Sequence, residues 1–254
     1  MWKGDYTFTT RCLVEKDFKI RYRNMSLGMF WSLLNPLIMM GVLWFIFVKV
    51  FPGNTMPYYP LAVLCGIVPF NFFSIAWANG TSSLLDSVGL VKRVPVPRQI
   101  IPIASVFSNC MHLLIQVGLL LVLVLAFGPR INIEWLWLPV LWALEIVFVC
   151  GLALIFSAVN VYVRDARYFV ESANNILFWL VPVFYSFSII PARFREIYMY
   201  NPIAALVMAL RNILLEGRAP ASSLLSKLTL VSFGTLVVGW FVFKKLQERF
   251  YEYL

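Results

Sequence analysis

Two arginines flank a tyrosine where the charged beginning of the sequence gives way to a long apolar stretch. Arg21 and Arg23 are the last charges before residues 24–48, a run of 25 residues without a charged side chain. A guanidinium group binds phosphate oxygens through two parallel hydrogen bonds, so two of them together suit a diphosphate. The pair therefore predicts an anion-binding site at a membrane surface. Attraction to bulk anionic lipid explains the same pattern, and the sequence leaves both interpretations open.

The residue types that catalysis requires are scarce. The sequence has one histidine, no HExxH or GxSxG motif, and no pair of acidic residues within one turn of an apolar segment. An enzyme that holds Mg²⁺ against a diphosphate needs clustered carboxylates, which are absent. The Walker A pattern, which binds nucleotide phosphates, is absent as well. We expect no catalytic residue, no metal site and no cofactor in this chain.

Polar side chains recur along the third apolar segment at spacings of three or four residues, which places them on one face of a helix. They are Ser105, Ser108, Asn109, His112 and Gln116. This face must contact protein or water, because unpaired polar groups are costly in lipid.

Glu145 is the only acidic residue at membrane depth, in the fourth apolar segment. Since neighbouring spans run in opposite directions, we predict that it hydrogen bonds His112 or Gln116 and clamps two helices together. A functional role is the alternative for any ionisable group inside a membrane. A proton relay is disfavoured, because it needs more than one titrating group.

Aromatic side chains are dense in the first and fifth apolar segments. Phe30, Trp31 and Trp44 belong to the first, and Phe178 and Tyr185 lie seven residues apart in the fifth, on one face of a helix. Aromatic faces suit the apolar C–H faces of sugar rings without burying a charge. These residues are therefore candidates for the lining of a channel. Interfacial belts and ordinary packing are the alternative interpretation.

The elements that position these residues follow from the composition. Of 254 residues, 61% are hydrophobic and only 13% are charged, whereas a soluble domain carries about 25% charged residues. The mean hydropathy is +0.81. These values predict an all-α polytopic membrane protein. Most of the charges behind the net +9 flank apolar segments, which indicates anionic membrane lipid and not nucleic acid as the partner.

Six apolar segments are predicted to cross the bilayer as helices, for which about 20 residues suffice. They cover residues 29–51, 61–83, 100–127, 135–163, 172–190 and 228–243. An even number of spans places both termini on the same side of the membrane. The termini and the links on that side hold fourteen of the 21 Lys and Arg residues, and because such residues favour the cytoplasmic side, both termini are predicted to be cytoplasmic. Residues 5–23 are predicted to form an amphipathic helix on the membrane surface. Its apolar face would carry Phe8, Cys12, Phe18 and Tyr22.

Two shorter elements connect the spans. Residues 86–97 form a polar link in which prolines stop any helix. Residues 201–217 carry helix signals, with Asn201 as N-cap, Pro202 at the first position and Gly217 as the stop. A helix of 15 residues is about 22 Å long, too short to cross a bilayer. It is predicted to be re-entrant or interfacial.

Four stretches, taken in their order around six spans, carry a resemblance. They are RYRNMSLGMFWSLLNP at 21–36, LVKRVPVPRQIIP at 90–102, VYVRDARYFVESANNILFWLVPVFYSFSIIP at 161–191 and NPIAALVMALRNILLEG at 201–217. Together they resemble the permease subunits of ABC-2 type exporters, specifically the group that exports polysaccharides such as O-antigen, capsule and teichoic acid. The resemblance implies one transmembrane domain over residues 1–254, with an interface helix within 1–28, a six-span bundle over 29–246 and a cytoplasmic tail at 247–254.

The resemblance also implies partners and roles. Two copies of the permease would work with two separate ATPase subunits, which bind the ATP and Mg²⁺. In this family the N-terminal helix and the link at 86–97, which is the cytoplasmic coupling helix, contact the ATPases, and this implies a coupling role for Asp86, Lys92 and Arg93. Residues 192–217 resemble the extracytoplasmic gate helices.

The gate helices would include Asn201, Pro202 and Arg211. The implied substrate is a polyprenyl-diphosphate-linked polysaccharide, whose diphosphate would bind Arg21 and Arg23 at the cytoplasmic face of the bacterial inner membrane. An ABC-2 exporter of drugs or lipids is an alternative within the same class. A membrane glycosyl- or phospho-transferase is an alternative of another class, which the absence of acidic clusters disfavours.

Overall fold

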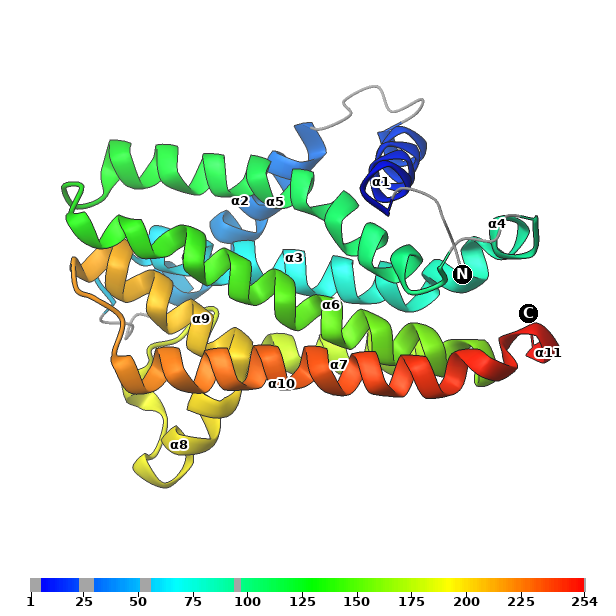
Figure 1. The fold of residues 1–254 in the computed structure, drawn as a ribbon. Coiled ribbons are helices and arrows are strands. Elements are labelled where there is room, and N and C mark those ends of the chain that lie inside the picture. The colour runs from blue at the N-terminus through cyan, green and yellow to red at the C-terminus, as the bar shows by residue number, and fades with distance from the viewer. Residues whose placement is uncertain (1–5, 23–29, 51–55, 94–96, 254) are drawn as a thin grey trace.

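The computed structural model describes residues 6–22, 30–50, 56–93 and 97–253, and within these ranges every regular element is a helix (Figure 1). Five helical stretches are long and apolar enough to cross a membrane. They are Phe30–Val50 (α2, Phe30–Trp44, with η1, Phe45–Val50), α3 (Tyr59–Asp86), α5 (Ile100–Phe127), Ile133–Tyr162 (η2, Ile133–Trp137, with α6, Leu138–Tyr162) and Ser222–Arg249 (α10, Ser222–Leu246, with η5, Gln247–Arg249). The all-α polytopic membrane fold is confirmed.

The fifth predicted span is not a continuous helix. α7 covers only Ala166–Leu180, and Val181 after it is extended, at φ −73° and ψ 138°. The residue before a proline is driven away from helical geometry, and Pro182 follows Val181. At 15 residues α7 is about 22 Å long. The prediction of a helix running to residue 190 was therefore wrong. Residues 181–186 form a non-helical segment, in which residues 181–184 are buried.

Elements from distant parts of the chain meet at one end of the bundle. A buried apolar cluster there joins Leu13 of α1 (Tyr6–Tyr22), Val91 of α4 (Val88–Arg93) and Phe250 of α11 (Phe250–Tyr253) to the ends of α3, α6 and α10. The Tyr162 hydroxyl also donates to the Leu246 carbonyl oxygen at 2.6 Å. α4 and α11 both lie at the right-hand end of the bundle in Figure 1. The N-terminal helix, the short link helix and the C-terminal helix thus share one end.

The predicted apolar face of α1 is turned away from the bundle, as a face that contacts the membrane surface would be. Leu13 is buried at this end of the bundle, whereas Phe8 is 66% exposed and Cys12 is exposed. The side chains of Phe18 and Tyr22 lie outside the described residues. The helix itself is present and packs against α5, so the element is confirmed, and the contact of its Phe8 and Cys12 face with the membrane surface stays a prediction.

α6 and α10 approach closely through glycine. A Cβ atom on Gly151 of α6 would lie 2.6 Å from the backbone nitrogen of Leu236, and one on Gly239 of α10 would overlap the Gly151 carbonyl oxygen. Small residues allow helix backbones in a membrane to touch directly and to gain dispersion contacts along their length. This contact joins the last long helix to the centre of the bundle.

The segment between α7 and α10 folds as two helices bent by 101°. They are α8 (Ala192–Tyr200) and α9 (Pro202–Arg211), which continues as η4 (Asn212–Glu216). The Asn201 side-chain oxygen accepts hydrogen bonds from the backbone nitrogens of Ile203 and Ala204 at 3.1 and 3.4 Å. Gly217 ends the element at φ 66°. The cap, the Pro202 position and the stop are confirmed, and all residues of α9 from Ile203 to Arg211 are buried.

Candidate functional site

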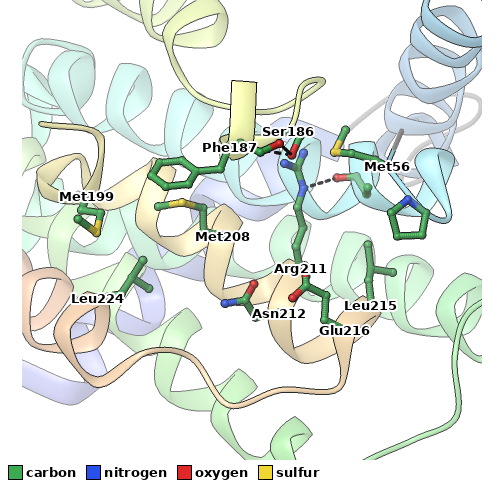
Figure 2. Close-up of a pocket in the computed structure, with 13 residues that line it drawn as sticks. Met56, Ser186, Phe187, Met199, Met208, Arg211, Asn212, Leu215, Glu216 and Leu224 are labelled. Carbon is green, nitrogen blue, oxygen red and sulfur yellow. Dashed lines mark hydrogen bonds between the residues drawn. The ribbon is translucent and has the colours of Figure 1, made fainter. Parts of the chain in front are cut away.

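Arg211 joins three elements at the C-terminal end of α7, opposite the end that holds α4. Its side chain is 8% exposed and extends from α9 toward Ser186 in Figure 2. Nε donates to the Ala62 carbonyl oxygen of α3 at 3.0 Å, Nη1 to that of Tyr185 at 3.1 Å and Nη2 to that of Val183 at 2.7 Å. No ion pair in the described part of the chain involves Arg211, so its charge is met by carbonyl dipoles.

These hydrogen bonds explain how the non-helical segment 181–186 is stable inside the helix bundle. Irregular backbone at membrane depth is tolerated only where protein or water satisfies its polar groups. Arg211 satisfies two carbonyl groups of residues 181–186, and the Tyr59 hydroxyl donates to the Phe184 carbonyl oxygen at 3.0 Å. Gly66 of α3 lets the segment come close, since a Cβ there would lie 2.8 Å from Cα of Val183.

A cavity of about 440 Å³ lies beside Arg211, between the α8–α9 pair and the start of α3 (Figure 2). Its polar lining comes from Ser186, Ser188, Asn212 and Glu216, and three methionines supply much of its apolar wall. A lining of hydroxyl, amide and carboxylate groups with apolar patches can bind a ligand that has both hydroxyl groups and C–H faces.

Phe184 is the centre of an aromatic cluster that the sequence did not reveal. Its ring stacks on Phe47 of η1, with centroids 5.3 Å apart and planes at 21°, and meets Trp179 edge-on at 5.3 Å. Phe178 and Tyr185 contact it at 6.1 and 5.2 Å. The two predicted residues therefore meet in one cluster, but not on one helix face, because α7 ends before Tyr185. The closely spaced aromatic pairs on either side of Pro182 were the available signal.

The other predicted channel residues lie apart from this cluster. Phe30, Trp31 and Trp44 are 52%, 51% and 38% exposed on α2, which instead buries Ser32, Pro36 and Leu43. Next to the cluster, Trp179, Tyr185, Phe194 and Tyr198 line a second cavity of about 560 Å³ together with Phe184. The predicted channel-lining aromatic residues are thus divided between α2 and the C-terminal end of α7.

The predicted clamp between Glu145 and the polar face of α5 is not formed. Gln116 Nε2 donates to the Ser32 carbonyl oxygen at 3.2 Å and lies 3.0 Å from His112 Nε2. Glu145 is 1% exposed, and neither of its carboxyl oxygens has a hydrogen-bond partner within the described residues. The clamp prediction was wrong because Gln116 Nε2 is directed toward α2 and not toward α6, although Gln116 Oε1 has no hydrogen-bond partner among the described residues. Asn109 accepts from Asn79 of α3 at 3.2 Å.

We expect the substitution Glu145→Gln to leave folded yield and transport within about twofold of the parent chain. The glutamine has nearly the same shape, loses no hydrogen bond, and as a neutral amide costs less to bury than an ion. Folded yield from gel filtration and transport in cells would be measured together. Complete loss of transport at normal yield would contradict this prediction and assign Glu145 a functional role.

The residues predicted at the opposite end are only partly described. Asp86 is the last residue of α3 and is exposed, as is Lys92 of α4. The side chains of Arg21 and Arg93, and the whole of Arg23, lie outside the described residues. The short helix predicted to touch a partner is therefore present as α4. Among the described residues, no group of three His, Cys, Asp or Glu side chains is placed to hold a metal ion.

Comparison with known proteins agrees with this architecture. The ABC-2 type transporter family matches residues 9–215. O-antigen export system permease proteins RfbA from Klebsiella pneumoniae and Myxococcus xanthus are each 30% identical to this chain, over 95% and 94% of it and 93% of their own length. The polysialic acid transport protein KpsM of Escherichia coli is 23% identical over 94% of both chains. The chain belongs to the ABC-2 type transporter family.

Proposed function

We propose that this chain is the permease subunit of an ATP-driven exporter that moves a polyprenyl-diphosphate-linked polysaccharide, such as O-antigen, across the bacterial cytoplasmic membrane. The similarity to O-antigen export permeases over nearly the whole chain carries the proposal. The aromatic cluster around Phe184 supports it, because aromatic faces stack on sugar rings without burying a charge.

The assembly we propose contains two copies of this chain and two separate ATPase subunits, which hold the ATP and Mg²⁺. α1 and α4 would contact the ATPases, with Asp86, Lys92 and Arg93 at the interface and both termini in the cytoplasm. The exposed positions of Asp86 and Lys92 are consistent with such a contact. Residues 192–217 would form the outer gate, held closed in part by Arg211. The chain itself would catalyse no reaction.

Deletion and complementation test this function. A strain that lacks the chain is expected to accumulate lipid-linked glycan in the cytoplasm and to lose it from the surface. Returning the chain together with the ATPase encoded beside it should restore the surface glycan, measured by immunoblot of intact cells. Unchanged surface glycan in the deletion strain would overturn the proposal, as would purification of the chain without a Walker A protein.

We further propose that Arg21 and Arg23 bind the diphosphate at the cytoplasmic face. The double substitution Arg21→Lys with Arg23→Lys keeps both charges but loses the paired hydrogen bonds of each guanidinium. Export is expected to fall about tenfold or more, since two charge-assisted contacts are weakened. Surface glycan and binding of purified lipid-linked glycan are the measurements. Wild-type values for both would show that the arginines only anchor the chain to anionic lipid.

A further inference from the structure

A polar cavity lies between α3 and α7 in the half of the bundle nearer α4. It has a volume of about 460 Å³, within the range of small-molecule sites. Ser74 and Asn79 of α3 line one side, and Glu171, Asn174 and Asn175 of α7 line the other. Five of its seven lining residues are therefore polar, in a part of the chain otherwise dominated by apolar side chains.

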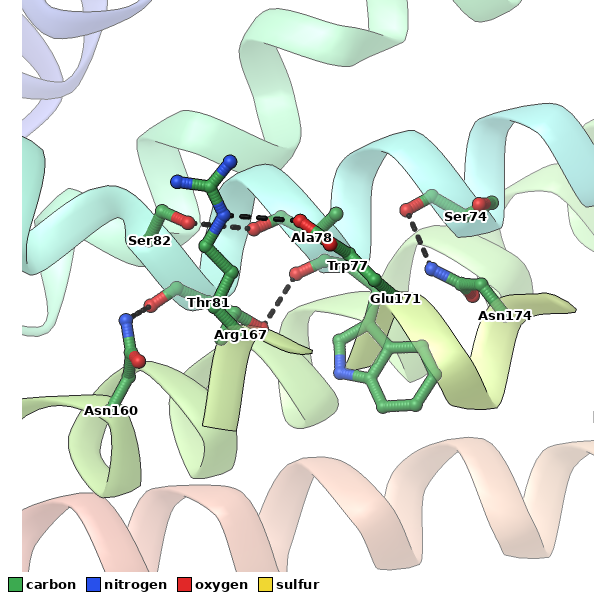
Figure 3. Close-up of polar contacts among 9 residues, drawn as sticks. All are labelled: Ser74, Trp77, Ala78, Thr81, Ser82, Asn160, Arg167, Glu171 and Asn174. Carbon is green, nitrogen blue, oxygen red and sulfur yellow. Dashed lines mark hydrogen bonds and ion pairs between the residues drawn. The ribbon is translucent and has the colours of Figure 1, made fainter. Parts of the chain in front are cut away.

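Asn174 carries an unused acceptor in this cavity. Its side-chain Nδ2 donates to the Ser74 carbonyl oxygen at 3.3 Å, as Figure 3 shows. The residue is 7% exposed, and its Oδ1 has no hydrogen-bond partner in the described part of the chain. A buried acceptor without a donor is costly, so a ligand that donates a hydrogen bond there would be stabilised.

The polar lining continues along α3 toward the end that holds α4. A second cavity, of about 430 Å³, shares Asn79 with the first and adds Ser83 and Asp86 of α3 with Ser105 and Ser108 of α5. From Ser74 to Asp86 the distance along the helix is about 18 Å. A row of hydroxyl and amide groups thus leads from the bundle end inward, past Asn79.

The charges along this row disfavour an anionic ligand. Lys16 pairs with Asp17 at 3.1 Å, and Arg167 pairs with Glu171 at 3.1 Å, so both cations are already compensated (Figure 3 shows the second pair). Asp86 adds a further negative charge. The remaining groups are hydroxyls and amides, which both donate and accept. This combination fits a neutral molecule with many hydroxyl groups.

We infer that the row from Ser74 to Ser83, with Asn174 and Asn175, is a binding subsite for the sugar rings of the exported glycan on their way into the bundle. The inference rests on the proposed function and adds to it the place and the side chains that hold sugar. Asn174 Oδ1 accepts from a sugar hydroxyl, and the Asn175 amide lies one residue further along the same wall.

Photo-crosslinking in the complete transporter tests this inference. A benzophenone side chain would be placed at position 175 or, as a control, at Ile176, which is exposed on the same helix but does not line the cavity. After irradiation of cells that make their own glycan, the chain is probed with an antibody to that glycan. We expect glycan-linked chain from position 175 and at least fivefold less from position 176. Equal labelling at both positions, or none at 175, would overturn the inference.

Substitutions give a second measurement. Asn175→Leu is expected to lower surface glycan about fivefold through the loss of one hydrogen bond to sugar, while Ser172→Leu, an exposed polar position of α7 outside the cavity, has no effect. Asn175→Gln, which keeps the amide, should recover part of the loss. Export equal to the parent in Asn175→Leu would overturn the subsite and leave the proposed function intact. Failure of the parent chain itself to restore surface glycan would overturn the proposed function instead.

Discussion

Replacing Arg211 with methionine is expected to lower the free energy of unfolding by about 3 kcal/mol. Each carbonyl group left without a donor costs about 1–3 kcal/mol, and Arg211 is the donor to two carbonyl groups of residues 181–186. Relief from burying the guanidinium offsets part of this cost. Arg211→Lys keeps the charge but cannot reach three separate carbonyl groups from one nitrogen, so we expect it to be intermediate. Thermal unfolding of the purified chain in detergent measures the effect.

The matched control for this prediction is Arg218→Met. Arg218 follows the same element, α9 with η4, but its side chain is 79% exposed, and the N–O distance of its ion pair with Glu216 is 4.0 Å. An exposed pair of this kind contributes between about 0 and 1 kcal/mol. If both methionine variants unfold at the same temperature as the parent, the carbonyl groups that Arg211 binds have other partners, and the structural role assigned to it is wrong.

The substitution Gly151→Ala is expected to cost about 2 kcal/mol, although alanine is favoured over glycine in a helix by about 1 kcal/mol. The added methyl group would lie 2.6 Å from backbone atoms of Thr235 and Leu236, so α10 must move away from α6. Overpacking of this kind costs about 1–3 kcal/mol, and separating the helices loses further contacts. Gly151→Leu should prevent folding. Folded yield and thermal unfolding in detergent are the measurements.

Gly234→Ala provides the control on α10 itself. A Cβ atom at position 234 would meet no other atom within 4 Å. The alanine should therefore be neutral or stabilise the chain slightly through its helix propensity. Equal unfolding temperatures for Gly151→Ala and Gly234→Ala would show that α6 and α10 are not held at the distance that the structure gives.

The long spans could be predicted because hydropathy and length are properties of contiguous sequence. The N-cap at Asn201 and the stop at Gly217 were equally local and were also confirmed. The end of α7 was predictable in principle from Pro182, but the surrounding apolar residues suggested a continuous span. The family and the class of transporter followed from motifs that lie in order along the chain.

The candidate site depends on contacts that sequence does not encode locally. Arg211 binds carbonyl groups of residues 149, 28 and 26 positions away, and any of many carbonyl groups could have taken that place. For Arg211 a contact was missed, whereas for Glu145 a contact was predicted that the structure does not form. Spacing placed it beside Gln116, but the rotation of α5 turns Gln116 toward Ser32 instead. Helix rotation is set by packing of all neighbours, which no single segment specifies.

Because α7 ends at Leu180, the proposed transport of a glycan along it has a consequence for the energy that each step requires. The hydrocarbon core of a bilayer is about 30 Å thick, whereas α7 is only about 22 Å long. Beyond Leu180, serine hydroxyls at 186 and 188 line the cavity beside Arg211. In the proposed export path, the helical wall that α7 provides is therefore about 8 Å shorter than the hydrocarbon core. On that path, fewer sugar units of a passing chain would lie against a continuous apolar helix at any one moment, and the energy needed for each advance would fall accordingly.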